Sequence, residues 1–333
     1  MIRRLLAHRN GEPADVLAVA ELPDDPPPGP GRVTVAVHAV GLNFLDVMLC
    51  RGTYPVRPDP PMTPGVEFAG RVVATGIGAE HLSDVDVVAC PALPHGALGE
   101  TVTLDAALAT PLPTGFDPVV AAALPVTYQT AFWALERAAV GAGQTVLVHA
   151  GAGGVGIAAT QLAVARGARV ICTAGGPAKL AVCRDNGADL AVDYREVDFV
   201  TAVREATGGA GVDVVLDPVG GDVFTRSLSC LDFEGRIVAI GAAGGPPPPV
   251  DPMALVAANT TLIGLSWGSA YPWRRPERVR EVYAELFALC SAGAVRPPVS
   301  RTATLDEAPS ALADLAARRT TGKIVVHVGG RTR

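Results

Sequence analysis

The sequence lacks several features that mark whole classes of protein. No basic run extends beyond short pairs such as Arg274-Arg275, and 27 Lys and Arg against 33 Asp and Glu leave a net charge of −6. This balance argues against nucleic acid or an anionic membrane as the main partner, because both select clustered positive charge. Apolar runs are interrupted well short of the ~20 residues that a membrane-spanning helix needs. We therefore expect a small molecule as the partner.

Cysteine is sparse and scattered. The six cysteines form no C-x-x-C pair and no dense cluster of the kind that a disulfide scaffold requires. The N-terminus, MIRRLLAHRNGEPADV, has no apolar stretch like that of a signal peptide. Both observations favour a cytoplasmic location.

Two domains are the expected organisation. The length of 333 residues exceeds the usual size of one domain, and 49% of the residues are hydrophobic, which is enough for a packed core. From Thr145 onward short β-branched runs alternate with amphipathic helices, a pattern typical of βαβ units. The expected strands lie at 145–150, 168–174, 190–194, 212–218, 235–241 and 261–267. They predict an α/β fold with a six-stranded, doubly wound parallel sheet of the Rossmann type.

The segments on either side of these strands have a different sequence pattern. Upstream of about residue 122, short strands such as 32–41 and 66–76 are punctuated by Pro and Gly and indicate a compact β-rich domain. After Trp267, a helix at 277–292 and a strand at 322–328 return to that style. We expect a nucleotide-binding domain at 123–265, inserted in a β-rich domain made of 1–122 and 266–333.

A glycine motif opens the predicted parallel sheet. In HAGAGGVG, Gly151, Gly153 and Gly156 fill the pattern G-x-G-x-x-G between a strand and a helix, the context in which it binds dinucleotides. The first glycine allows a tight turn, the second lets the backbone approach a pyrophosphate, and the third lets the helix pack closely on the sheet. The alternative is a glycine-rich turn without a ligand.

The end of the second predicted strand lacks a carboxylate. A cofactor with a free 2′-hydroxyl is normally held by Asp or Glu about 20 residues beyond the motif. Here the chain offers Gly175 and Lys179, and the third strand ends at Tyr194. An ammonium and a phenol can bind a 2′-phosphate, so these residues favour NADPH over NADH. Alternatively, Lys179 is simply a solvated helix residue.

Five segments carry a family resemblance. They are VGLNFLDVMLCRGTYP (40–55), PGVEFAGRVVATG (64–76), AALPVTYQTAFWAL (122–135), the glycine motif, and TTGKIVV (320–326). Together they resemble the medium-chain dehydrogenase/reductase superfamily and, within it, the zinc-free quinone oxidoreductase and enoyl reductase branch. The resemblance covers nearly the whole chain. It implies a GroES-like domain around the Rossmann domain, and a homodimer through the edge strand at 261–267, whose free backbone groups invite pairing.

The sequence departs from the zinc-dependent members of this superfamily. They place a Cys where this chain has Asn43, and a G-H-E motif where it has Gly65-Val66-Glu67. Both changes remove metal ligands, and the four-cysteine lobe of the structural zinc is also missing. We therefore expect no metal. Without a Lewis acid, alcohol oxidation is not expected, and reduction of a polarised acceptor remains.

The resemblance also implies site residues. Asn43 and Asp46 would lie beside the nicotinamide ribose, although Asn43 can equally cap a helix that begins at Phe44, with Asp46 balancing the helix dipole. Tyr54 aligns with a proposed proton donor of enoyl-thioester reductases, or packs its ring in a loop. The implied cofactor contacts are Asn43, Thr127, Trp133, Gly151, Gly153, Gly154, Val155, Gly156, Gly175, Lys179, Tyr194, Pro218, Gly241 and Ala242, with the choice between Arg318 and Arg319 left open.

The predicted activity is NADPH-dependent hydride transfer to a quinone or enone. One alternative is an enoyl-thioester reductase of fatty acid or polyketide metabolism. The other is a protein that binds NADPH without turning over an acceptor.

Overall fold

The structure, a computed structural model, describes residues 1–55, 58–90, 96–246 and 248–329. The chain divides into two compact units. The first consists of Met1–Val126, Gly268–Ala284 and Pro297–Arg333, and the second of Thr127–Trp267 and Glu285–Arg296. The domain ranges predicted from the sequence stay a prediction; this grouping differs from them chiefly in placing 285–296 with the second unit.

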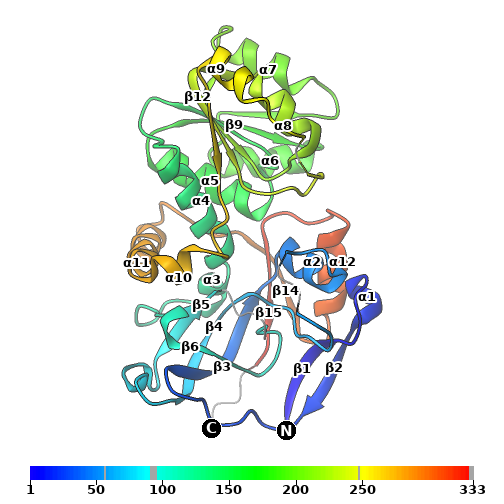
Figure 1. Cartoon of the computed structure of the whole chain (residues 1–333), viewed down its shortest axis with the longest axis vertical. Helices are drawn as coiled ribbons and strands as arrows, with labels where there is room; N and C mark the ends of the chain where they lie inside the picture. Colours follow the sequence, from blue (N-terminus) through cyan, green and yellow to red (C-terminus); the bar gives the residue numbers. More distant parts are fainter. Residues whose placement is uncertain (56–57, 91–95, 247, 330–333) are drawn as a thin grey trace. The chain divides into compact units, whose positions relative to one another are not determined.

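The second unit contains the parallel sheet. Within the described residues its six strands follow the order β10-β9-β8-β11-β12-β13, with every pair parallel. Two of them, β9 and β12, are labelled in Figure 1. The strands are β8 (Thr145–Val148), β9 (Arg169–Ala174), β10 (Leu190–Asp193), β11 (Val212–Asp217), β12 (Leu231–Ala239) and β13 (Thr261–Gly264). The prediction of a six-stranded, doubly wound parallel sheet is confirmed. The strand order reverses between β8 and β11, and open α/β sheets bind ligands at the carboxyl ends of strands at such a point.

Helices pack on this sheet because strand side chains alternate between its faces. Leu147, Ile171 and Ile237 share a buried cluster with Phe199 and Phe224, which belong to α7 (Phe199–Ala206) and α8 (Gly221–Leu228). The neighbouring strand residues point the other way, where Cys172 meets Thr160 of α5. The remaining helices assigned mainly to this unit are α4 (Pro125–Arg137), α5 (Gly154–Ala165), α6 (Pro177–Asp185) and α9 (Pro252–Ala258).

The first unit is built on a mixed sheet. Among the described residues its order is β14-β15-β3-β4-β5-β7, and β6 also pairs with β3. These strands are β3 (Arg32–Gly41), β4 (Glu67–Thr75), β5 (Asp86–Ala89), β6 (Thr101–Asp105), β7 (Ala109–Pro111), β14 (Val299–Thr304) and β15 (Lys323–His327), beside a hairpin of β1 (Ile2–Ala7) and β2 (Leu17–Leu22). Val325 of β15 faces Gly41 of β3. This pairing brings Lys323, the first residue of β15, next to Asn43.

Short helices complete the first unit. They are α1 (Pro13–Val16), α2 (Phe44–Arg51), η1 (Glu80–Leu82), η2 (Ala106–Leu108), α3 (Pro118–Ala122), α10 (Tyr271–Arg274) and α12 (Ala308–Ala316), while α11 (Pro276–Ser291) contributes residues to both units. The helix expected from Phe44 is therefore present. In the described part of the chain, no helix is both long and apolar enough to cross a membrane.

Candidate active site

A buried ion pair lies at the start of α2. The Nζ atom of Lys323 lies 2.5 Å from Oε1 of Glu67, and their side chains are 3% and 0% exposed. The same ammonium donates to the carbonyl of Leu42 and to Oδ1 of Asn43, each at 2.8 Å. All three of its protons thus have an acceptor inside the protein, which is the condition under which a buried charge is tolerated.

The side chain of Asn43 is held from both ends by this pair. Its amide Nδ2 donates to Oε1 of Glu67 at 2.7 Å and to the Gly41 carbonyl at 3.3 Å, while its Oδ1 accepts from Lys323. The second oxygen of Glu67 accepts from the backbone N–H of Val126 at 2.6 Å. Asn43 occupies the N-cap position of α2. Its orientation is therefore set by groups from β4 and β15 as well as by its own helix.

Asp46 ties α2 to the segment before β4. Its Oδ2 accepts from the Asn43 backbone N–H at 2.8 Å, and its Oδ1 accepts from the N–H groups of Gly65 and Val66 at 2.9 and 3.2 Å. Burial raises the pKa of Asp46 to about 6, against the effect of these hydrogen bonds and of Lys323. The carboxyl group is fully buried. Its hydrogen bonds position Asn43 and the loop at Gly65.

Tyr54 and the two candidate arginines also belong to the first unit. Tyr54 is half-buried against the core of that unit, and burial raises the pKa of its phenol. The guanidinium of Arg319 binds Asp314 through Nε at 3.0 Å and Nη2 at 2.6 Å. Arg318 is exposed and has a left-handed backbone, with φ of 58°. The choice between Arg318 and Arg319 as a cofactor contact therefore stays open.

The glycine-rich turn joins β8 to α5 in the second unit. A Cβ on Gly156 would lie 2.3 Å from the carbonyl oxygen of Ala150, so a side chain there would force the helix off the turn. Gly153 is the N-cap of α5, and its nearest obstacle, the same oxygen, is 3.2 Å away. Gly154 and Val155 are partly exposed. The first N–H groups of any helix have no partner within it, so this turn can receive an anion.

The first glycine of the motif serves a purpose other than the one expected. The positive φ of this turn, 52°, belongs to Ala150, and not to Gly151. A Cβ on Gly151 would lie 2.7 Å from Cβ of Cys172. A glycine is needed here because the neighbouring strand and helix leave no room for a side chain.

A cluster of side chains lies over Gly175, at the carboxyl end of β9. A Cβ on Gly175 would lie 2.7 Å from Nε of Arg195 and 2.9 Å from the phenol oxygen of Tyr194. Tyr194 is 53% exposed, and Lys179 is half-buried in the first turn of α6. Arg195 was missed by the sequence reasoning, although it follows Tyr194 directly.

The carboxylate of Asp193, beside this cluster, is turned toward the backbone. Its two oxygens accept from the N–H groups of Gly176 at 2.9 Å and of Arg195 at 3.0 Å. The side chains of this cluster, Arg195, Tyr194 and Lys179, are cationic or neutral, which suits a phosphate.

The other predicted contacts occupy strand ends or α4. Thr127 and Trp133 are buried, and the indole N–H of Trp133 donates to Gln129 at 3.0 Å. Pro218 follows β11, and a Cβ on Gly241 would lie 3.0 Å from its carbonyl oxygen. Pro218, Gly241 and Ala242 thus share the carboxyl edge of the sheet, beside the point where its strand order reverses.

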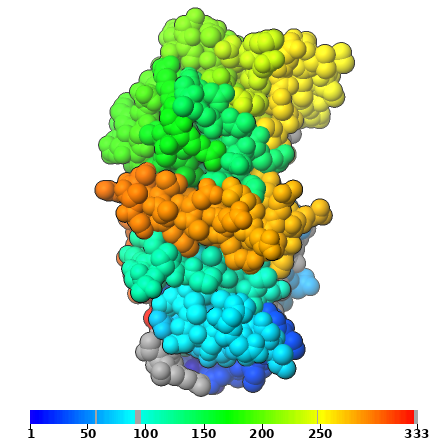
Figure 2. All heavy atoms as spheres, turned by 90° about the vertical axis from the view of Figure 1, so that its left-hand side faces the viewer, coloured from blue at the N-terminus to red at the C-terminus, as the bar shows by residue number. Residues whose placement is uncertain are grey.

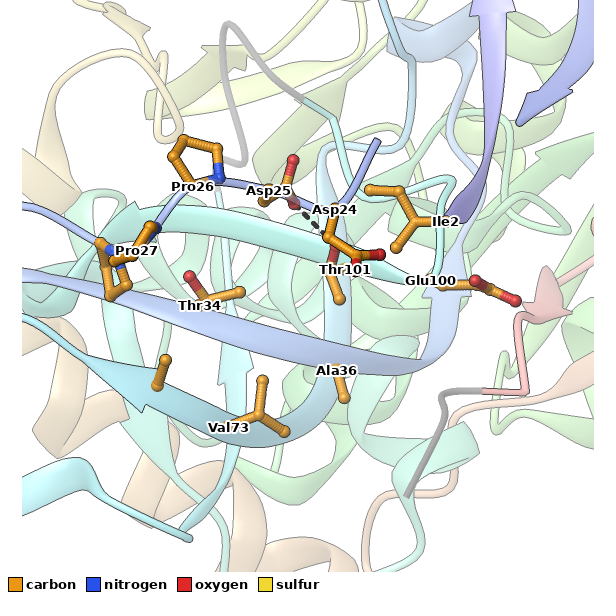
Figure 3. Close-up of a pocket in the computed structure, with 12 residues that line it drawn as sticks. Ile2, Asp24, Asp25, Pro26, Pro27, Thr34, Ala36, Val73, Glu100 and Thr101 are labelled. Atoms are coloured by element: carbon orange, nitrogen blue, oxygen red, sulfur yellow. Dashed lines mark hydrogen bonds between the residues drawn. The ribbon is translucent and has the colours of Figure 1, made fainter. Parts of the chain in front are cut away.

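A separate cavity of about 310 Å³ lies in the first unit. Figure 3 shows it between the segment at Asp24–Pro28 and strands β3, β4 and β6. Its carboxylates are already engaged: Asp25 binds Arg4 at 2.8 Å and Thr101 at 2.7 Å, and Asp24 pairs with the N-terminus at 2.9 Å. None of the predicted site residues lines it.

The residues at Asn43 do not fit a catalytic zinc. The Asn43 amide is engaged at both ends, and the cation beside Glu67 is an ammonium. The described residues contain no group of three or more His, Cys, Asp or Glu that could hold a metal ion.

Comparisons with known proteins agree with the fold. One family model, the alcohol dehydrogenase GroES-like domain, matches residues 29–114, and another, the zinc-binding dehydrogenase, matches 154–288. Quinone oxidoreductase-like protein 2 of Bos taurus is 37% identical over 303 residues, covering 90% of this chain and 86% of that protein. Phthioceranic/hydroxyphthioceranic acid synthase of Mycobacterium tuberculosis is 36% identical over 319 residues, which are 91% of this chain and 14% of the synthase.

A solved structure extends this likeness to three dimensions. The structure of Escherichia coli quinone oxidoreductase complexed with NADPH has a TM-score of 0.91 at 31% identity, and the match covers 98% of this chain and 100% of that one. Sequence relatives, family models and fold point the same way, and the chain belongs to the quinone oxidoreductase family of the medium-chain dehydrogenases/reductases.

Proposed function

We propose that the chain is an NADPH-dependent reductase that transfers hydride to a quinone or an enone. The observation that carries the proposal is the cluster over Gly175. A Cβ on Gly175 would lie 2.7 Å from Nε of Arg195 and 2.9 Å from the phenol oxygen of Tyr194, and Lys179 lies in the first turn of α6, which begins two residues after Gly175. Such a set of donors suits the 2′-phosphate that distinguishes NADPH from NADH. The Escherichia coli relative was solved with NADPH.

The chain's own residues would bind and orient. The nicotinamide supplies the hydride when the cofactor is bound. The glycine-rich turn would hold the pyrophosphate at the N-terminus of α5. Asn43, whose orientation is set by Lys323 and Glu67, would hold the nicotinamide ribose in place. Holding the cofactor in a reactive geometry accelerates hydride transfer. Either Arg318 or Arg319, which precede the Gly322-Lys323 element, would reach the cofactor.

A steady-state assay with NADPH and NADH tests the cofactor half of the proposal. Arg195→Ala should raise KM for NADPH about tenfold, the loss of one charge-assisted hydrogen bond, and leave KM for NADH unchanged. Arg184→Ala is the matched control, because Arg184 lies exposed at the opposite end of α6. An equal effect of Arg195→Ala on both coenzymes would contradict a 2′-phosphate site.

The second candidate is reduction of an enoyl thioester, which the likeness to the mycobacterial synthase favours. Burial raises the pKa of the Tyr54 phenol, so Tyr54 stays protonated at neutral pH and can give its proton to an enolate. Loss of NADPH absorbance against a quinone, an enone and a crotonyl thioester separates the two candidates. No turnover with any acceptor would instead support a binding protein without catalysis.

The same proposal includes a homodimer formed through β13. This strand ends the sheet order among the described residues, and an open strand edge can pair with a second copy. The adjoining surface exposes Leu262 and, on α9, Met253 and Val256; the segment that carries α9 is coloured yellow in Figure 2. Leu262→Arg should convert a dimer to a monomer in light-scattering chromatography, whereas Ile77→Arg, at an exposed apolar residue of the first unit, should not.

A further inference from the structure

Two buried thiols meet beneath the glycine-rich turn. Cys172 lies in β9 and Cys183 in the last turn of α6, and both side chains are fully buried. Their thiols are hydrogen-bonded to each other. A Cβ on Gly151 would lie 2.8 Å from Sγ of Cys172 and 2.9 Å from Sγ of Cys183. The two sulfurs therefore share one small space against the first glycine of the turn.

The pair is chemically asymmetric. The hydrogen bond from Cys172 lowers the pKa of Cys183, and the charge of Arg184 acts in the same direction, while burial opposes both. The same hydrogen bond and burial raise the pKa of Cys172. Cys183 is therefore the thiol that ionises more readily, and the thiolate is the form that reacts with oxidants.

The helix that carries Cys183, α6, has few other buried side chains. Cys183 is the only residue of α6 whose side chain is fully buried, and α6 is nine residues long. Segments with few buried contacts open at a fraction of the global unfolding free energy. Such local opening gives a small oxidant access to a thiol that is covered in the closed state.

We propose that Cys172 and Cys183 are an oxidation site, at which hydrogen peroxide produces a disulfide that weakens binding of the dinucleotide. The statement about binding rests on the proposed function. The formation of the disulfide does not, because it depends only on the two thiols.

The chemistry balances with one peroxide. The Cys183 thiolate attacks one peroxide oxygen and the O–O bond breaks. The departing hydroxide takes up one proton, equivalent to the one that the Cys183 thiol lost, and leaves as water; Cys183 becomes a sulfenic acid. The Cys172 sulfur then attacks the Cys183 sulfur, the S–O bond breaks, and the hydroxyl leaves with the Cys172 proton as a second water. Two thiols lose two electrons and two protons, and hydrogen peroxide is reduced to two waters.

The disulfide and the cofactor are coupled through α6. A disulfide holds its sulfurs about 2.05 Å apart, closer than two thiols in contact, and so draws the end of α6 toward β9. The other end of α6 carries Lys179, and both sulfurs lie where they would clash with a Cβ on Gly151. Both proposed phosphate-binding points would shift. Coupling is reciprocal, so a bound dinucleotide must also oppose formation of the disulfide.

Mass spectrometry of the whole protein tests the oxidation site directly. The protein is treated with hydrogen peroxide, with and without NADP⁺, alkylated after denaturation, and digested with trypsin, which places Cys172 in peptide 170–179 and Cys183 in peptide 180–184. We expect these two peptides as a linked pair, lighter by two hydrogens and separated by reductant. Cys50 and Cys230, which are buried elsewhere, serve as internal controls and should stay alkylated. Full alkylation of both Cys172 and Cys183 would overturn the proposal.

Binding is measured separately, by the fluorescence of NADPH titrated with reduced or oxidised protein. We expect roughly tenfold weaker binding after oxidation, within the usual range of coupling between two sites, and slower formation of the linked pair with NADP⁺ present. Cys183→Ser should keep its affinity under peroxide, whereas Cys290→Ser, the control, should lose it as the natural protein does. A linked pair with unchanged affinity would refute the coupling. Reduced protein that binds no NADPH would refute the proposed function and leave the result on the linked pair intact.

Discussion

Replacement of Lys323 by Met tests the central claim about the first unit. The change deletes the ammonium and leaves the carboxylate of Glu67, which is 0% exposed, without its cation, although Asn43 and Val126 still donate to it. Removing one member of a buried ion pair destabilises a protein by about 3–5 kcal/mol, because the remaining charge is uncompensated. We therefore expect Lys323→Met to lower the free energy of unfolding by about that amount.

Two comparisons make the result specific. In the double variant Lys323→Met, Glu67→Gln residue 67 no longer carries a charge that lacks its cation, and most of the lost stability should return. Arg3→Met removes the exposed pair with Asp306, whose side chains are 43% and 64% exposed, and such pairs contribute about 1 kcal/mol or less. Urea unfolding followed by circular dichroism measures all three variants. A loss for Lys323→Met no larger than that for Arg3→Met, or a double variant no more stable than Lys323→Met, would refute the reasoning.

Three further outcomes follow from other residues. Burial lowers the pKa of His149 to about 3, so below about pH 6.5 the unfolded chain takes up a proton that the folded state refuses, and stability falls by about 1.4 kcal/mol per pH unit. His149→Gln should therefore flatten the dependence of urea unfolding on pH between about 6.5 and 4.5, and an unchanged slope would contradict the assignment. Gly151→Ala places a Cβ 2.7 Å from Cβ of Cys172 and should lower the free energy of unfolding by about 1–3 kcal/mol through overpacking. Its melting temperature should fall further than that of Gly153→Ala. Tyr54→Phe should slow reduction of a crotonyl thioester by about 10²-fold or more, as loss of a general acid does, and leave quinone reduction unchanged; equal slowing of both would point to a packing role.

Local sequence patterns predict most of the second unit. The alternation of β-branched runs with helices fixes both the number of strands and their parallel pairing, because each βαβ unit is contiguous in the chain. Five of the six predicted strands extend past the observed ones at their carboxyl ends, β9 being the exception. For example, 261–267 was expected where β13 ends at Gly264. Apolar residues continue into the loops there, and composition alone cannot show where hydrogen bonding stops.

The contacts that organise the site were less predictable, because they join distant segments. Glu67 and Lys323 are 256 residues apart, and only the pairing of β15 with β3 brings them together. The sequence does not indicate that Cys172 and Cys183 are in contact, because only the packing of α6 against β9 brings them together. Arg195 shows the same limit at shorter range: the sequence identified Tyr194 beside it, but only the approach of both to Gly175 shows that they act at one place.

The burial of Lys323 has a practical consequence. Lys179 and Lys323 are the only lysines in the sequence, and the second is sealed inside the first unit. Reductive methylation with ¹³C-formaldehyde should therefore mark Lys179 and the terminal amine alone in the native protein. A third methyl resonance in the NMR spectrum would then show that Lys323 had become accessible, and therefore that the interior of the first unit had opened to water.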